Sequence, residues 1–332
     1  MVGRRRRRGR EPVEGQARPA ARAEARRRCG VERIAARCVA QQTERLVQVS
    51  DVDVRIAALN VYPVKSCGGV ALDESVLVET GLEFDRAWMV VDHVGRFVTQ
   101  RELPRMALIR PQLRGSDMIL RASRMLALHV ALDAVEQAAR VTVWDDEVAA
   151  YDMGDLAAQW FSDFLETRLR LVRFDPEQQR FSNRKWTGDI AAENAFADAF
   201  PLLVTSTAGL DELNRRLASN GVDAVTMARF RPNLVLDGLD ANGEDHLDEI
   251  VFDTDDGAVR LKLVKPCSRC TIPDVDPLTA ATGHAVGDAL AAYRTDSRLE
   301  GAVTFGMNAV IVEGVERVLR IGMSGGATYR FD

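Results

Sequence analysis

Two cysteines three positions apart are the residues of this chain best suited to chemistry. Cys267 and Cys270 lie within residues 264–273, and Lys265 and Arg269 flank them. Nearby cations favour the thiolate, which is the form that attacks substrates and binds metals. The residue types and their spacing therefore predict a nucleophile or a soft metal ligand in this segment.

Other roles for the cysteine pair have less support. Zinc needs about four ligands, whereas the other three cysteines and the four histidines are scattered along the chain. A thioredoxin-like pair precedes a helix, but Pro273 indicates a loop here. Two buried structural cysteines suit the flanking charges poorly. We therefore favour one thiolate that binds a transition metal brought by a cofactor.

Three further segments could bind an anionic ligand. Ser206 and Thr207 stand where a predicted strand gives way to a predicted helix, so their hydroxyls and the free amide groups could bind a phosphate. An ordinary helix cap is the simpler interpretation of the same residues. The segment 229–233 is basic, and the segment 63–69 carries Lys65, one of only four lysines. Together the three segments predict a pocket for a phosphorylated cofactor.

Short strands separated by turns dominate the elements that must position these residues. Alternating apolar residues predict strands at 54–62, 73–79, 86–92, 106–113, 118–122, 140–151, 168–174, 201–205, 232–236, 249–253, 259–265, 303–312 and 316–322. Helical spacing of apolar residues predicts helices at 155–166, 207–217 and 284–293. The pattern indicates a β-rich α+β fold with a small barrel or sandwich and few helices.

The composition is that of a globular protein of about two domains. The chain has 332 residues, of which 46% are hydrophobic and 28% charged. No apolar run reaches the roughly 18 residues that a membrane helix needs. Five scattered cysteines do not form an even disulfide framework, so we expect a reducing cytoplasm and no membrane partner.

The N-terminal segment differs sharply from the rest. Residues 1–47 contain fourteen Arg and five Glu, a net charge of +9, and the remainder therefore carries −14 of the total of −5. Few large apolar residues are present, so we predict a disordered extension over residues 1–50. The acidic remainder argues against a nucleic-acid partner.

With these motifs in this order, the chain resembles the MOSC-domain proteins that carry an N-terminal β-barrel partner domain. That group includes bacterial reductases of N-hydroxylated bases and the mitochondrial amidoxime reducing component. The resemblance extends from about residue 54 to residue 323. The matching motifs are Tyr62-Pro63-Val64-Lys65-Ser66, Gly81 to Trp88, Thr99-Gln100-Arg101, Phe230-Arg231-Pro232-Asn233, and Cys267-Ser268-Arg269-Cys270 followed by Asp276.

The resemblance implies two β-barrel domains and molybdenum-cofactor chemistry. Domain boundaries are expected at 51–175 for the MOSC N-terminal β-barrel-like domain, 176–325 for the MOSC domain and 326–332 for a tail. Cys270 would bind the molybdenum, and Asp276 would orient its loop or handle protons. The cofactor contacts that the resemblance implies fall on Lys65, Ser66, Arg86, Ser206, Thr207, Arg231, Asn233, Ser268 and Arg269. Gln100 and Arg101 are expected to help line the site.

The activity implied is reduction of N-hydroxylated compounds, such as hydroxylamino-purines or amidoximes, by oxygen-atom abstraction at a Cys-bound molybdenum. Bacterial relatives often carry a [2Fe–2S] domain, and sulfurase relatives carry a pyridoxal-phosphate desulfurase. We expect neither in this chain, so a separate reductase or ferredoxin-like protein would supply electrons. Two alternatives remain, namely a sulfur carrier that uses a cysteine persulfide and a non-catalytic carrier of the cofactor.

Overall fold

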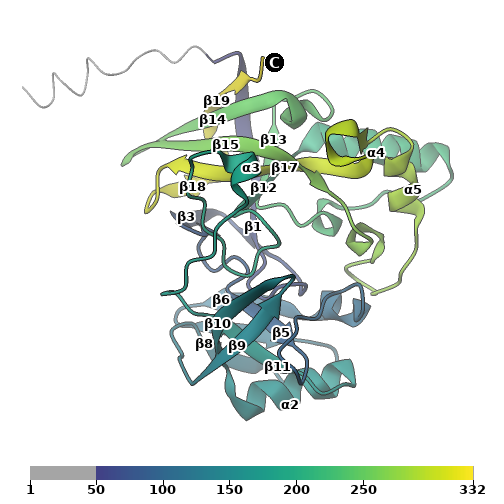
Figure 1. The fold of residues 1–332 in the computed structure, drawn as a ribbon. Helices are drawn as coiled ribbons and strands as arrows, with labels where there is room; N and C mark the ends of the chain where they lie inside the picture. The colour runs from purple at the N-terminus through teal and green to yellow at the C-terminus, as the bar shows by residue number, and fades with distance from the viewer. Residues whose placement is uncertain (1–49, 332) are drawn as a thin grey trace, which may run out of the picture. The chain divides into compact units, whose positions relative to one another are not determined.

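A closed seven-stranded barrel is built from two distant parts of the chain in the computed structural model, which describes residues 50–331 (Figure 1). The strands follow the order β12-β13-β1-β19-β14-β15-β17, and the pairing of β12 with β17 closes the barrel. Their bounds are β1 (Val52–Val61), β12 (Leu202–Ser206), β13 (Leu234–Asp237), β14 (Leu247–Thr254), β15 (Gly257–Ser268), β17 (Ala302–Glu313) and β19 (Ser324–Tyr329). Two short strands extend the sheet, β2 (Val70–Leu72) beside β1 and β16 (Thr295–Asp296) beside β17.

Apolar side chains that alternate along the strands fill this barrel. On β15 the inward positions include Leu261 and Leu263, and on β14 they include Ile250 and Phe252; all four are fully buried. Alternation places every second side chain on one face of a strand, so these residues bury a continuous core. β15 leaves this core at its C-terminal end, and that end delivers Cys267 to the surface of the barrel.

Smaller sheets and one helix form two further apolar cores. One of these sheets has the order β5-β11-β10-β9 and the other β6-β7-β8. The strand β3 pairs with both β18 and β4, and the apolar side chains of these three strands pack into the barrel core. The bounds of all these strands are β3 (Glu74–Val78), β4 (Gly81–Leu82), β5 (Trp88–Val91), β6 (Arg110–Arg114), β7 (Asp117–Arg121), β8 (Leu128–Ala131), β9 (Gln137–Val143), β10 (Asp146–Asp152), β11 (Arg170–Phe174) and β18 (Val318–Arg320). The helix α2 (Gly154–Leu165) packs Trp160, Phe161 and Phe164 against Trp88 and its neighbours.

Few helices accompany the strands within residues 50–331. Besides α2 they are α3 (Arg184–Thr187), α4 (Thr207–Ser219) and α5 (Ala285–Ala291). Leu213 and Leu217 of α4 pack with Val286 and Leu290 of α5. None of the helices in this range has the length and apolar character that a membrane crossing requires. The predicted β-rich fold with few helices is confirmed.

Several predicted elements differ from the observed ones. The expected strand at 140–151 is a hairpin of β9 and β10, because Trp144 turns the chain with a left-handed backbone of φ 56°. The first part of the expected strand at 106–113 is a 3₁₀ turn, Pro104–Leu108, which begins with a proline. Residues 324–329 form β19 between β1 and β14, although a tail was expected from residue 326. The extension expected at 1–50 lies outside the described residues, apart from Ser50.

Candidate functional site

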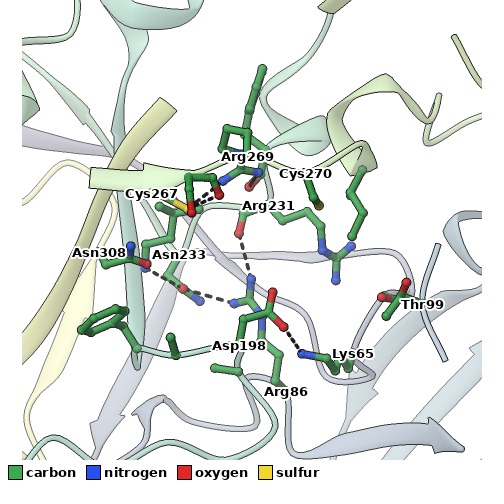
Figure 2. A pocket seen from close by; sticks show the side chains of 18 of the residues that line it. Lys65, Arg86, Thr99, Asp198, Arg231, Asn233, Cys267, Arg269, Cys270 and Asn308 are labelled. Carbon is green, nitrogen blue, oxygen red and sulfur yellow. Dashed lines mark hydrogen bonds and ion pairs between the residues drawn. The ribbon is translucent and has the colours of Figure 1, made fainter. Parts of the chain in front are cut away.

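One cavity is lined by most of the side chains that the sequence assigns to cofactor binding (Figure 2). We call it the cationic cavity. Loops at residues 65–66, 86 and 99–101 contribute one side of it, and the barrel contributes the other through β12, β17 and the end of β15. The predicted residues that line it are Lys65, Ser66, Arg86, Arg231, Asn233, Ser268, Arg269 and Cys270.

The two cysteines have different surroundings in this cavity. Cys267 is half-buried, and its Sγ accepts a hydrogen bond from Arg269 Nη1 at 3.1 Å. Cys270 is exposed, and Figure 2 shows it beside Arg269 on the side of the cavity opposite Lys65. Exposure makes Cys270 the thiol that an incoming metal can reach. Cys267 is instead tied to the neighbouring guanidinium.

Positive charge dominates the lining. Lys65, Arg86, Arg101, Arg231 and Arg269 are the cationic side chains, and among the described lining residues only Asp198 is acidic. Burial, reinforced by the nearby Arg86, lowers the pKa of Arg231 to about 10. Arg231 is therefore still a cation at neutral pH, and the cavity favours an anionic ligand.

Two buried nitrogens in this lining have no hydrogen-bond partner. They are Arg231 Nη2 and Arg269 Nε. An unsatisfied buried donor costs about 1–3 kcal/mol, so native structures seldom leave two in one cavity. A phosphate or another anionic group of a cofactor would accept hydrogen bonds from both. The donor set therefore fits an anionic cofactor.

One tyrosine ring holds two of the guanidinium groups in place. Arg86 and Arg231 stack over the ring of Tyr62, with centroid distances of 4.5 and 4.2 Å. Asp85 accepts from the Tyr62 backbone N–H at 2.7 Å and forms an ion pair with Arg86. Burial raises the pKa of Tyr62 to about 12, so the ring stays neutral. The two cations are thus positioned before any ligand binds.

Backbone strain is concentrated at the same cavity. Ser66, Arg86 and Arg231 all have left-handed backbones, with φ of 65°, 49° and 60°. Non-glycine residues rarely adopt this region, and such strain tends to collect at functional sites. The strained residues are three of those predicted to bind the cofactor.

Lys65, which is buried, forms an ion pair with the exposed Asp198 that the sequence analysis did not identify. Lys65 Nζ lies 2.5 Å from Asp198 Oδ1 and 2.8 Å from the carbonyl oxygen of Phe196. Burial lowers the pKa of Lys65, against the opposing effect of Asp198. Burial alone would raise the pKa of Asp198, but Lys65 and the Trp144 indole lower it to about 2. Asp198 follows no motif, and only the fold brings it to Lys65.

Arg101 and Asn233 line the cavity, whereas Gln100 lies outside the lining. Asn233 and Gln100 both support residues of the lining. Asn233 Oδ1 accepts from Arg86 Nη1 at 3.2 Å and from Leu203 N at 3.1 Å, and its Nδ2 donates to Asn60 O at 3.3 Å. Gln100 Nε2 donates to Ser66 O at 2.7 Å. Both amides are engaged with the protein, so they orient Arg86 and Ser66.

The structure does not bring Ser206 and Thr207 to the cationic cavity. Ser206 caps α4, since its Oγ accepts from Gly209 N at 3.1 Å, and its backbone N–H donates to Glu244 Oε1 at 3.2 Å. Thr207 Oγ1 donates to Asp237 Oδ1 at 3.3 Å. Ser206 therefore has the helix-capping role of the simpler interpretation, and Thr207 is the first residue of α4 and is bonded to Asp237.

Asp276 also lies outside the lining and holds the loop after Cys270. Its carboxylate pairs with Arg229 at 2.9 Å and accepts from the backbone N–H groups of Leu278 and Thr279. Burial would raise the pKa of Asp276, but these hydrogen bonds and Arg229 lower it below its usual value. A carboxylate held in this way is suited to fixing a loop and poorly suited to carrying a proton.

Within residues 50–331, no group of three or more His, Cys, Asp or Glu side chains is placed to hold a metal ion. Cys270, as the exposed thiol of the cavity, is suited to be one ligand of a metal that arrives with its other ligands already in place.

Comparison with known proteins identifies two consecutive domains. Residues 53–168 match the MOSC N-terminal beta barrel domain, and residues 191–323 match the MOSC domain. The chain is 35% identical over 248 residues to mitochondrial amidoxime-reducing component 1 of Mus musculus, covering 72% of this chain and 69% of that protein. It is 34% identical over 264 residues to mitochondrial amidoxime reducing component 2 of Homo sapiens, covering 76% and 75%. It is also 30% identical over 270 residues to the human molybdenum cofactor sulfurase, covering 76% of this chain but 29% of that protein.

Proposed function

This chain belongs to the family of proteins in which a MOSC N-terminal domain precedes a MOSC domain, and from that premise we propose that it is a molybdenum-dependent reductase of N-hydroxylated compounds. The observation that carries the proposal is that an exposed cysteine shares one cavity with five cationic side chains, two of which have unpartnered buried nitrogens. The names of two relatives, both amidoxime-reducing components, support the substrate class.

The residues that would hold the cofactor divide into a metal ligand and a set of anion ligands. Cys270 Sγ would bind the molybdenum. Arg231 Nη2 and Arg269 Nε would donate to anionic oxygens of the cofactor, and Ser268 lies between the two cysteines in the same lining. When bound, the cofactor supplies a two-electron redox metal that takes the oxygen of an N–O bond.

Other residues in and around the cavity position its cationic side chains and the loop that carries Cys270. Tyr62, Asp85 and Asn233 hold Arg86 towards the cavity. In the Lys65–Asp198 pair the proton resides on Lys65 Nζ at neutral pH, because the pKa of Asp198 is lowered to about 2. Asp276 and Arg229 fix the loop that carries Cys270, and we assign Asp276 this orienting role.

The overall reaction balances without a further co-reactant from this chain. An N-hydroxylated group takes up two electrons and two protons, its N–O bond breaks, and the products are the amine or amidine and one water. A separate electron-donor protein would supply the electrons.

We keep the cytoplasm as the proposed location, and fractionation of native cells tests it. We also keep the domain boundary near residue 175 as a proposal, and limited proteolysis tests it.

The experiment combines metal analysis with a reduction assay. The full chain is produced in a host that makes the cofactor, and we expect stoichiometric molybdenum and conversion of 6-N-hydroxylaminopurine to adenine with a chemical reductant. Cys270→Ala should lose both properties, and Cys267→Ser should keep the metal. A metal-free wild-type protein would contradict the proposal. Bound metal without reduction would point to a carrier of the cofactor.

A sulfur carrier is the second candidate, favoured by one observation. Arg269 Nη1 lies 3.1 Å from Cys267 Sγ, and a guanidinium stabilises an anionic sulfur such as a persulfide. Mass spectrometry of the protein as purified would show an added sulfur atom on a peptide containing Cys267 or Cys270. That sulfur should disappear on treatment with a thiol.

A further inference from the structure

A second hollow adjoins the cationic cavity and shares Arg101 with it. We call it the aromatic groove, and its principal lining residues are Phe97, Arg101, Glu102, Trp144 and Asp145. Two aromatic rings and several carboxylates face this groove, whereas the cationic cavity has a single carboxylate among its described lining residues. The two hollows therefore suit different parts of a ligand, and Arg101 joins them.

Trp144 is the principal apolar surface of this groove. It stands at the turn between β9 and β10 in a left-handed conformation, and 45% of its surface is exposed. Its ring makes a T-shaped contact with Phe97 at a centroid distance of 5.0 Å, and the Arg101 guanidinium lies over it, 4.8 Å from its centroid. A large ring that is strained and exposed contributes little to a core. Its position beside a ligand cavity suggests a role in binding.

The hairpin tip is tied to the wall of the cationic cavity in two places. Trp144 Nε1 donates to Asp198 Oδ1 at 3.2 Å. Asp146 pairs with Arg180 at 2.7 Å, and Arg180 donates to Ala197 O at 2.7 Å and to Asp198 O at 3.2 Å. These contacts hold the indole at a defined place relative to the loop that carries Asp198. A ring held in this way can orient a ligand with little loss of entropy on binding.

We propose that Trp144 determines substrate specificity by stacking against the planar ring of an N-hydroxylated substrate. The ring would lie in the aromatic groove, and the N-hydroxyl group would extend past Arg101 into the cationic cavity. This inference rests on the proposed function, since it assigns the substrate class that the reductase favours. Stacking of a base on an aromatic side chain changes affinity by roughly 5- to 150-fold on alanine substitution.

The test compares a ring substrate with a ringless one on the holoenzyme. In Trp144→Ala, KM for 6-N-hydroxylaminopurine should rise at least about tenfold, whereas kcat/KM for N-hydroxyurea should stay within about twofold. Trp144→Phe keeps a ring but loses the Nε1 donor, so it should retain most of the affinity. Phe331→Ala removes an aromatic ring that is 83% exposed and outside both hollows, and serves as the matched control.

A binding measurement separates this inference from the proposed function. The dissociation constant of adenine, the expected product, is measured by equilibrium dialysis against wild type and Trp144→Ala with equal molybdenum content. A weakening of about tenfold or more supports the inference. Unchanged adenine binding in Trp144→Ala would overturn it, as would equal losses on both substrates. If wild type reduces neither substrate, the proposed function fails, and adenine binding alone still decides on Trp144.

Discussion

The cationic cavity and the N-terminus of α4 both looked like anion sites in the sequence, but their unsatisfied atoms are of opposite kinds. In the cavity the unpartnered buried atoms are donors, Arg231 Nη2 and Arg269 Nε. Beside the N-terminus of α4 they are acceptors, Glu244 Oε2 and Asn242 Oδ1. Unpartnered donors favour an anion, and unpartnered acceptors disfavour it.

The helix terminus already contains a carboxyl group of the protein. Glu244 is fully buried, and its Oε1 accepts from the backbone N–H of Ser206 at 3.2 Å. A carboxyl group of the protein itself thus occupies the position at the helix N-terminus where a negative group is favourable. Hydroxyl residues at the start of a helix therefore indicate an anion site only when the nearby donors remain free.

The largest expected effect comes from removing a free donor in the cavity. In Arg231→Ala, the molybdenum content of protein purified from a cofactor-producing host should fall by about tenfold or more, because a hydrogen bond to a charged group contributes roughly 1.5–3 kcal/mol. Inductively coupled plasma mass spectrometry measures the metal. Ser206→Ala is the matched control at the other region, and it should keep its molybdenum and lose only about 1 kcal/mol of unfolding free energy. Equal metal loss in both variants would remove the distinction between the regions.

A smaller effect is expected at Glu244, and it should appear in stability. Glu244→Ala leaves the Ser206 N–H buried without its acceptor, so the free energy of unfolding should fall by about 1–3 kcal/mol. Glu244→Gln keeps an acceptor and should cost less. Chemical denaturation of both variants measures the difference.

The raised pKa of Glu244 also predicts how the stability of these variants changes with pH. Burial raises the pKa of Glu244, so the folded state holds a proton more tightly than the unfolded state. Stability from this group is complete at low pH and is lost as the pH rises from about 4.5 through the raised value. The stability of Glu244→Gln relative to that of wild type should therefore rise with pH. A relative stability that falls as the pH rises would contradict this account.

The smallest effect on stability is expected at Asp198, and its pH dependence has the opposite sign to that of Glu244. Its pKa is lowered to about 2, so its stabilising contribution is present above about pH 4 and is lost as the pH falls towards 2. Because its side chain is 67% exposed, solvent screening limits this contribution to about 1 kcal/mol or less. Asp198→Asn should lose less stability than wild type over this range, measured by denaturation at each pH. A larger loss in the variant would show that Lys65 does not stabilise the carboxylate.

The sequence was sufficient for features that depend on neighbouring residues. Alternating apolar residues located most strands, and the motif around Cys267 and Cys270 located one wall of the cavity. The Lys65 and Arg231 segments also reach the cavity as predicted. These signals are local, because strand periodicity and a loop of fixed spacing need no knowledge of distant contacts.

Features that depend on long-range contacts were missed. Asp198 carries no local signal, and its role depends on Lys65, which is 133 residues away. Whether Ser206 caps a helix or binds a phosphate depends on Glu244, which is 38 residues away. The apolar pattern predicts a strand that continues through Trp144, because a left-handed backbone is unusual for a residue of that size. The tertiary fold decides each of these cases.

X-ray absorption at the molybdenum edge tests most directly whether Cys270 is the metal ligand in the cationic cavity. Wild type, Cys270→Ser and Cys267→Ser are purified with the cofactor and compared. We predict that Cys270→Ser replaces one sulfur ligand by oxygen in the metal that it retains, and that Cys267→Ser has the wild-type spectrum. An unchanged sulfur coordination in Cys270→Ser, or a loss of sulfur in Cys267→Ser, would contradict the account.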